Sequence, residues 1–338
     1  MQVTIPEAIE HLKLCIKAGL PCMLTGSPGT GKSEISKQVG DFYKLFPIDI
    51  RLSQCDPVDM NGLPAFKDGK ASYIPMDMWP VAGTPIPKGY NGFLIILDEF
   101  NSASLAVQAA SYKVVLDRVI GQVPLHPKTA IICIGNLATD NAIVNRLSTA
   151  MQSRLIHLEL AVDASSWLSD WAIPNKIDHR ILTYIQRYPD KLYNFDPDHD
   201  DKTFATLRTW YFVHKLLKLT PGDLTPILAP IAGTIGEGIG REFVMFTTIY
   251  DELPTFEEIK KNPKVVPIND EPSMLWAVSH MVSSGANKDN MPPLMEFIDR
   301  LPVEFATITL QNILRTQKEL IKLPCLQEWM RVNGAELF

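Results

Sequence analysis

One segment of the sequence has the residue types and the spacing of a phosphate-binding loop. The residues that fit the pattern G-x-x-x-x-G-K-S/T are Gly26, Ser27, Pro28, Gly29, Thr30, Gly31, Lys32 and Ser33. Glycines permit backbone angles that let successive N–H groups point at phosphate oxygens. We expect Lys32 to place its ammonium group on the β- and γ-phosphates of a nucleotide and the Ser33 hydroxyl to ligate Mg²⁺. The alternative is an ordinary glycine turn at the start of a helix.

Two carboxylates follow a continuously apolar run at residues 93–97. Such a run is typical of a buried strand, and the carboxyl end of a strand in an open α/β sheet delivers its last residues to the ligand crevice. We expect Asp98 to hold Mg²⁺ and Glu99 to polarise the water that attacks the γ-phosphate. Alone, an acidic pair would mark only a solvated strand end. The phosphate-binding loop upstream favours the catalytic interpretation.

Other polar side chains occupy positions from which they could reach the same phosphates. Asn136 follows the apolar run 130–134 and could bridge the γ-phosphate and the attacking water, or simply begin a turn. Arg154 could neutralise charge that develops on the γ-phosphate, or form a surface salt bridge. Arg146 competes with it for the first role. Arg208 opens a helix of the second half and could reach a nucleotide from there.

The elements that must position these residues alternate along the first half of the chain. Apolar runs predict strands at 22–25, 48–52, 93–97, 130–134 and 155–160, and helix-forming stretches lie at 33–43, 102–119 and 141–153. This alternation predicts an α/β fold with a five-stranded parallel sheet. The proline-rich interval 55–90 predicts a long ordered surface insertion. Its Trp79 either packs into the core or grips a substrate.

The second half of the sequence is predicted to be helical. Helical stretches are predicted at 177–188, 207–219, 224–235, 239–250, 273–283, 293–300 and 303–323. We therefore expect a nucleotide-binding domain over residues 1–161, a helical domain over 162–252 and a C-terminal helical extension over 253–338. The sequence of the extension indicates no role.

Composition limits the classes of protein to which the chain could belong. Its 338 residues include 32 basic and 38 acidic side chains, so the net charge of −6 gives no overall attraction to nucleic acid or anionic lipid. No apolar run approaches the roughly 20 residues that span a bilayer, so we expect no membrane insertion. Five scattered cysteines and a start without a basic segment indicate a reduced, cytoplasmic protein.

Together these motifs resemble those of the AAA+ ATPases, and within them of the MoxR-like branch. The resemblance covers residues 4–250, with residues 26–33 as Walker A and 94–99 as Walker B. It assigns Asn136 as sensor 1, Arg154 as arginine finger and Arg208 as sensor 2. It implies a P-loop NTPase domain followed by a helical lid. Where family members carry an aromatic residue after the finger arginine, this chain has Leu155.

The same resemblance implies how the protein would work. It implies a homo-oligomeric ring, a hexamer, with ATP at the subunit boundaries and the finger supplied by the neighbouring subunit. The ring would remodel or activate a partner protein, which in this branch often carries a von Willebrand factor A domain. Two other functions stay open: an ATP-driven motor on nucleic acid, which the net charge disfavours, and a nucleotide-gated scaffold.

Overall fold

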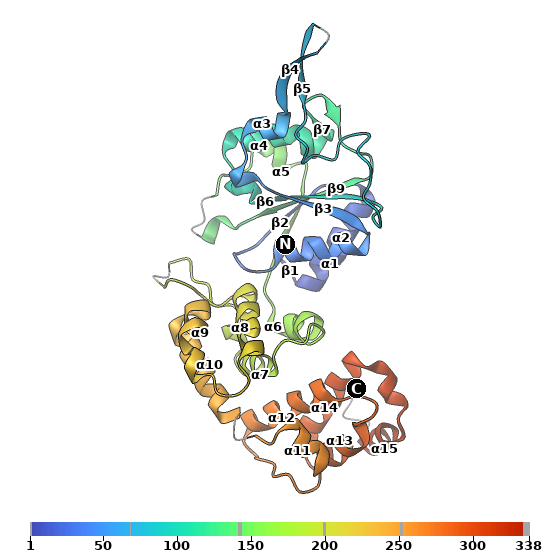
Figure 1. Cartoon of the computed structure of the whole chain (residues 1–338), viewed down its shortest axis with the longest axis vertical. Helices are drawn as coiled ribbons and strands as arrows, with labels where there is room; N and C mark the ends of the chain where they lie inside the picture. Colours follow the sequence, from blue (N-terminus) through green and yellow to red (C-terminus); the bar gives the residue numbers. More distant parts are fainter. Residues whose placement is uncertain (1, 68, 141–143, 199–200, 251–252, 334–338) are drawn as a thin grey trace. The chain divides into compact units, whose positions relative to one another are not determined.

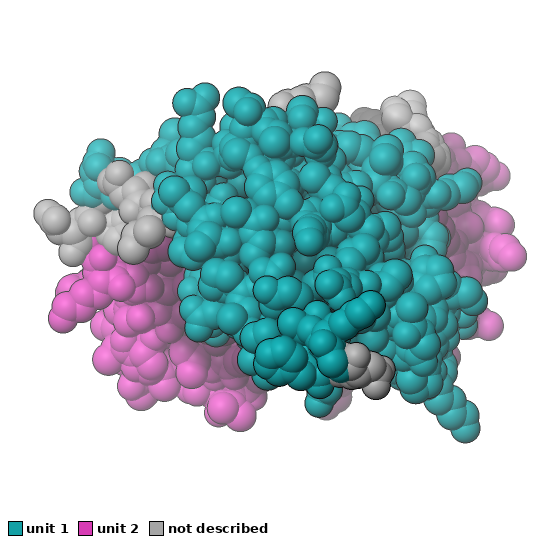
Figure 2. All heavy atoms as spheres, turned by 90° about the horizontal axis from the view of Figure 1, so that it is seen from above, with its two compact units in different colours: residues 1–163, 196–199 teal, residues 164–195, 200–338 magenta. Residues whose placement is uncertain are grey.

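The computed structural model describes residues 2–67, 69–140, 144–198, 201–250 and 253–333. The chain divides into two compact units, coloured separately in Figure 2. The first unit comprises Met1–Asp163 with Asp196–His199, and the second comprises Ala164–Phe195 with Asp200–Phe338. The predicted boundary between residues 252 and 253 adjoins residues outside the described part, and the three-domain division stays a prediction.

The first unit is built on a parallel six-stranded sheet (Figure 1). In sheet order, its strands are β1 (Gln2–Val3), β10 (Ile156–Leu160), β2 (Cys22–Thr25), β9 (Thr129–Gly135), β6 (Gly92–Asp98) and β3 (Leu45–Arg51). All five predicted strands are present, so the predicted parallel α/β fold is confirmed. The predicted number of five strands is wrong by one. The additional strand β1 has two residues, too few to show a hydrophobic pattern, and pairs with β10 through Val3 and Leu160.

Alternate residues of the central strands pack on opposite faces of this sheet. On β2, Leu24 joins the core beneath α1 (Ile5–Ala18) and α2 (Lys32–Phe42), whereas Met23 joins the core of the other face. The strands β6 and β9 alternate in the same way. Both faces are therefore covered, which explains why β6 and β9 read as continuously apolar in the sequence. Sequence analysis predicted the helix α2 but not α1.

The opposite face of the sheet carries shorter elements. The helix α4 (Leu105–Tyr112) continues into a π-helical turn at Lys113–Asp117 and is followed by the hairpin β7 (Val119–Ile120) and β8 (Val123–Pro124). The prediction of one helix over 102–119 is thus partly wrong. The prediction of a helix over 141–153 is wrong as well. Residues 141–143 lie outside the described residues, 144–148 are not helical, and α5 covers only Thr149–Gln152, where Ser148 caps it.

The proline-rich interval is an ordered insertion, as predicted. It contains the helix α3 (Pro57–Asn61) and the antiparallel hairpin of β4 (Leu63–Lys67) and β5 (Lys70–Ile74), which extends beyond the body of the first unit in Figure 1. Trp79 is buried, and its Nε1 donates a hydrogen bond to the Asp59 carbonyl at 2.7 Å. Trp79 is therefore a packing residue and cannot contact a substrate from the surface.

The second unit is helical, as predicted for this half of the chain. Its helices before residue 251 are α6 (Ala164–Ser166), a π-helical turn at Trp167–Ala172, α7 (His179–Arg187), α8 (Leu207–Leu219), α9 (Leu228–Ile235) and α10 (Glu237–Tyr250). Aromatic side chains hold three of them together. The ring centroid of Tyr184 on α7 lies 5.6 Å from that of Trp210 on α8 and 5.3 Å from that of Phe243 on α10.

The last helices of the chain share a hydrophobic core of their own. They are α11 (Phe256–Lys261), α12 (Pro272–Gly285), α13 (Met291–Ile298), α14 (Val303–Thr316) and α15 (Pro324–Asn333). Sequence analysis missed α11 and α15 and predicted α14 too long. Short 3-10 segments complete the described structure at Leu52–Gln54, Phe100–Ser102, Ala138–Asp140, Pro189–Lys191, Thr225–Ile227 and Lys318–Lys322. No helix in the described residues is long and apolar enough to cross a membrane.

Candidate functional site

The predicted phosphate-binding loop connects β2 to α2 at the carboxyl edge of the sheet. Gly29 and Gly31 have φ angles of 75° and 89°, a region that side chains rarely adopt, which accounts for glycine at these positions. The helix α2 begins after Gly31, and no side chain of the described residues caps it with a hydrogen bond. Its first N–H groups, together with the positive end of the helix dipole, are therefore available to an anion.

Lys32 lies directly inside this loop and is buried, with 7% of its surface exposed. Its Nζ is 2.6 Å from the Gly26 carbonyl, 2.9 Å from the Ser27 carbonyl and 3.3 Å from Oδ1 of Asn136. Carbonyl and amide oxygens thus hold the ammonium group inside the loop. From this position we expect it to contact a phosphate.

The acidic pair at the end of β6 lies against the start of α2. The Ser33 hydroxyl donates a hydrogen bond of 2.8 Å to Oδ2 of Asp98, and the Glu99 backbone N–H donates one of 2.8 Å to Oδ1 of the same carboxylate. Glu99 adopts a left-handed conformation with a φ angle of 55°. Its carboxylate accepts a hydrogen bond from Ser53, which follows β3. The turn thus separates the two carboxylates, with Asp98 toward Ser33 and Glu99 toward Ser53.

Asn136 is positioned by an asparagine that sequence analysis did not single out. The Asn101 side chain donates a hydrogen bond of 2.7 Å to the Asn136 carbonyl and accepts one of 3.1 Å from its backbone N–H. The preceding residue, Gly135, leaves room for this contact, because a Cβ atom there would lie 2.5 Å from Oδ1 of Asn101. The backbone of Asn136 is therefore fixed while its side chain reaches Lys32.

A second residue missed by sequence analysis, the acidic Asp140, contacts the phosphate-binding loop. Asp140 ends the turn Ala138–Asp140 and accepts a hydrogen bond of 3.0 Å from the Ser27 hydroxyl through Oδ1. Asp140 is 8% exposed, and its Oδ2 atom is buried without a hydrogen-bond partner in the described residues. The segment that follows Asn136 is thus tied to the loop at both of its ends. The sequence signals were weak: Asn101 and Asp140 each follow a predicted site residue by two to four positions.

The arginines are placed differently from the other predicted site residues. Arg154 follows α5 and is exposed, and its Nη1 donates to the Ala150 carbonyl at 2.9 Å. Arg146 is also exposed and lines, with Asn136 and His157, a cavity of about 490 Å³ at the edge of the sheet. Neither arginine has a carboxylate within ion-pair distance among the described residues. Arg208 is exposed on α8 of the second unit, and its role toward a nucleotide stays a prediction.

The donor atoms at this edge of the sheet fit a magnesium–triphosphate ligand. Mg²⁺ prefers hard oxygen ligands and in nucleotide sites takes one or two from the protein, the rest coming from phosphates and water. The Ser33 hydroxyl and the Asp98 carboxylate supply such oxygens from adjacent positions. No group of three or more His, Cys, Asp or Glu in the described residues could hold a metal ion by itself. Lys32 and the N–H groups of α2 suit the phosphates.

Two buried cysteines on strands of the sheet, Cys22 and Cys133, contribute no nucleophile to this site. All five are free thiols. Cys133 is buried within β9, and burial raises the pKa of its thiol well above the usual range. The hydrogen bond that the Cys22 thiol on β2 donates to Cys15, together with burial, raises the pKa of Cys22 in the same direction. Both stay protonated and unreactive near neutral pH.

Comparisons with known proteins found similarity at the level of structure. No protein-family model and no curated protein matches the sequence. A mutant form of RuvB from Thermotoga maritima has 17% identity, covers 77% of this chain and 78% of its own, and has a TM-score of 0.41. The Thermotoga maritima RuvB Holliday junction branch migration motor has 15% identity, coverages of 76% and 74%, and a TM-score of 0.39. NtrX from Brucella abortus in complex with ADP has 14% identity, coverages of 98% and 68%, and a TM-score of 0.38. Similarities of this size do not assign a family or a function to the chain.

Proposed function

We propose that this protein is an AAA+ ATPase of the MoxR-like branch, which hydrolyses ATP in an oligomeric ring to remodel or activate a partner protein. One observation carries the proposal. Ser33 and Asp98, 65 positions apart in the sequence, share a hydrogen bond, and Lys32 of the same loop reaches Asn136. Residues predicted separately for metal binding, phosphate binding and sensing thus meet at one sheet edge, as hydrolysis of a triphosphate requires.

Each residue of this cluster has a distinct task in the proposed reaction. The loop N–H groups and Lys32 hold the β- and γ-phosphates, and Asn136 orients the attacking water. Glu99 accepts a proton from that water as it attacks the γ-phosphorus, and ADP leaves. Ser33 and Asp98 would hold Mg²⁺, which supplies positive charge to the phosphate oxygens. Ser53 donates a hydrogen bond to the Glu99 carboxylate and would keep it in place before ATP arrives.

The proposed ring rests on the family resemblance and on the exposed position of Arg154. Arg154 is exposed and has no carboxylate partner within ion-pair distance among the described residues, which suits a group offered to a neighbouring subunit. We propose that Arg154 completes the site of the next copy in a hexamer, with Arg146 as the competing candidate. Arg208 would contact the same nucleotide from the helical lid, in cis or in trans. An isolated subunit would then bind ATP but hydrolyse it slowly.

The partner protein is proposed from the family resemblance alone. A MoxR-like ATPase in the cytoplasm would act on a client protein that carries a von Willebrand factor A domain. An ATP-driven motor on nucleic acid is the alternative, and stimulation of ATP hydrolysis by DNA with a steep dependence on salt would favour it. Continued partner activation by a Glu99→Gln variant with ATP bound would instead favour a nucleotide-gated scaffold.

Binding and hydrolysis measured on three variants test the proposed ATPase. We expect Lys32→Ala to abolish ATP binding in calorimetry. We expect Glu99→Gln to bind ATP as the unchanged protein does and to lose about 10²–10⁴-fold in turnover, the usual contribution of a general base. Glu10→Gln, which removes an exposed carboxylate of α1, is the matched control and should leave turnover unchanged. Equal turnover of the Glu99→Gln variant and the unchanged protein would refute the assignment.

A further inference from the structure

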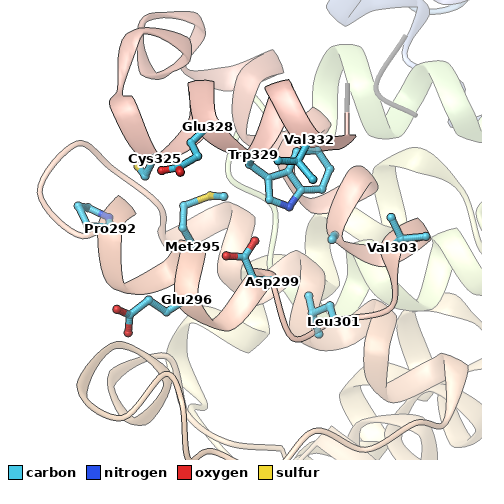
Figure 3. Close-up of a pocket in the computed structure, with 11 residues that line it drawn as sticks. Pro292, Met295, Glu296, Asp299, Leu301, Val303, Cys325, Glu328, Trp329 and Val332 are labelled. Carbon is cyan, nitrogen blue, oxygen red and sulfur yellow. The ribbon is translucent and has the colours of Figure 1, made fainter. Parts of the chain in front are cut away.

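The C-terminal helices enclose a cavity of about 710 Å³ that is separate from the proposed ATP site (Figure 3). It lies within the hydrophobic core region formed by α13, α14 and α15. Its floor consists of the buried side chains Met295, Leu301, Ala306 and Trp329. A volume of this size is within the range of about 300–1,000 Å³ that is typical of ligand-binding sites.

Two helices present one face each to this cavity. On α15, Cys325, Glu328, Trp329 and Val332 line it, at the spacing i, i+3, i+4 and i+7 that places residues on one helix face. The helix α13 and the turn after it also line the cavity with residues at this spacing, and Met295 is one of them. Val332 is 73% exposed although it is apolar. The cavity is thus an open groove between two helix faces whose apolar surface continues to solvent.

All charged residues that line the groove are acidic. They are Glu296, Asp299 and Glu328, and no Lys, Arg or His of the described residues lines it. In Figure 3 the Asp299 carboxylate points toward the space between Met295 and Trp329. Glu296 has a cation at 3.5 Å in Lys264, which does not line the groove. Asp299 and Glu328 have no cation within ion-pair distance among the described residues, so they create a negative potential over the apolar floor that favours a cationic occupant.

We propose that this groove binds a basic amphipathic helical segment of a partner protein. An apolar side chain of that segment would fill the floor beside Trp329, and flanking Lys or Arg side chains would pair with Asp299 and Glu328. Grooves between helices bind amphipathic helices in this way, by apolar anchors at i, i+3, i+4 and i+7. Burial raises the pKa of Asp299, which agrees with a carboxylate that lacks a compensating cation. The inference does not depend on ATP hydrolysis.

Calorimetry of the full chain with designed helical peptides tests the proposal. The probe is a peptide of about four turns with leucine on one face and lysine on both flanks. We expect dissociation constants on the order of 1–100 μM that rise with salt concentration. Glu328→Lys, which places a like charge opposite the peptide, should weaken binding about tenfold or more, and Asp299→Asn should weaken it several-fold. Glu319→Lys, at an exposed carboxylate outside the groove, is the matched control and should bind as the unchanged chain does.

Several results would overturn the proposal. Equal binding of a peptide with glutamate in place of lysine would show that charge does not select the occupant. Equal binding of a linear polyamine and the peptide would show that the apolar floor contributes nothing. A change in oligomeric mass of the Glu328→Lys chain in sedimentation, without a change in peptide affinity, would identify a second copy of this chain as the occupant. No peptide binding up to about 1 mM would also refute it.

Discussion

Replacement of Arg154 by alanine should separate catalysis from folding more sharply than any other single change. The Arg154 side chain is exposed and makes one hydrogen bond, to the Ala150 carbonyl at 2.9 Å, without an ion pair among the described residues. Surface substitutions of this kind change the free energy of unfolding by about 0.5 kcal/mol or less. We therefore expect denaturant unfolding of Arg154→Ala to match that of the unchanged chain.

The expected loss of activity is far larger. An arginine finger contributes about 10³–10⁵-fold to the rate of phosphoryl transfer. This corresponds to about 4–7 kcal/mol of transition-state stabilisation. Affinity for ATP should change little, because Lys32 and the proposed phosphate-binding loop are intact in the variant. Turnover and calorimetric ATP binding, measured on the same preparation, check both expectations.

Mixing two inactive variants shows whether the finger acts between subunits. Lys32→Ala keeps Arg154 but loses ATP binding, and Arg154→Ala keeps the ATP-binding loop. In randomly mixed rings, about a quarter of the sites would combine an intact loop with an intact finger from the neighbour. The mixture should therefore recover about a quarter of the original turnover, provided that sites act independently. Arg146→Ala, measured in the same assays, tests the competing candidate, because Arg146 is a second exposed arginine of the same unit. Full activity of Arg154→Ala, or no recovery on mixing, would refute the reasoning.

Three further predictions concern metal binding, the loop contact and a buried histidine. Asp98→Asn should raise the Mg²⁺ concentration needed for half-maximal turnover about tenfold or more, and an unchanged Mg²⁺ titration would contradict the assigned ligand. Ser27→Ala should lower the free energy of unfolding by about 1–3 kcal/mol, because it leaves the buried Asp140 carboxylate without its hydrogen bond. In a double-mutant cycle, Asp140→Ala should then cost less in the Ser27→Ala background than alone. Burial lowers the pKa of His280 from 6.5 to about 4, with a smaller effect of a nearby histidine. Stability should therefore be full above pH 6.5 and fall by up to about 3 kcal/mol as the pH drops toward 4, because the unfolded chain binds the proton first. Unfolding curves of His280→Leu should show a flatter dependence over this range, whereas those of the control His11→Gln, at an exposed histidine, should not.

The strands that are buried on both faces of the sheet could be predicted from the sequence. The strands β6 and β9 are apolar throughout because both faces of the sheet are covered. Their sequences therefore show a continuous apolar run and not the alternation of a half-exposed strand. The short strand β1 could not be predicted because two residues carry no pattern. The error over residues 141–153 has a different cause: helix-forming residues occur there, but the backbone of Asn145 instead bonds to that of Asn101.

The site was predictable where it depends on the order of elements and not where it depends on loop conformation. Parallel strands bring their carboxyl ends to one edge, so Asp98 and Asn136 were expected near Lys32. The partners Asn101 and Asp140 reach this edge through turns whose backbone angles no spacing rule encodes. Asn101 lies close only because Gly135 has no side chain.

Under the proposed function, the left-handed backbone at Glu99 means that folding and turnover make opposite demands on this position. For residues other than glycine, asparagine and aspartate, this region of φ and ψ costs roughly 1–2 kcal/mol, and Glu99 occupies it. A library randomised at this codon and sorted by thermal resistance should therefore enrich glycine. The same library sorted by phosphate release should return glutamate.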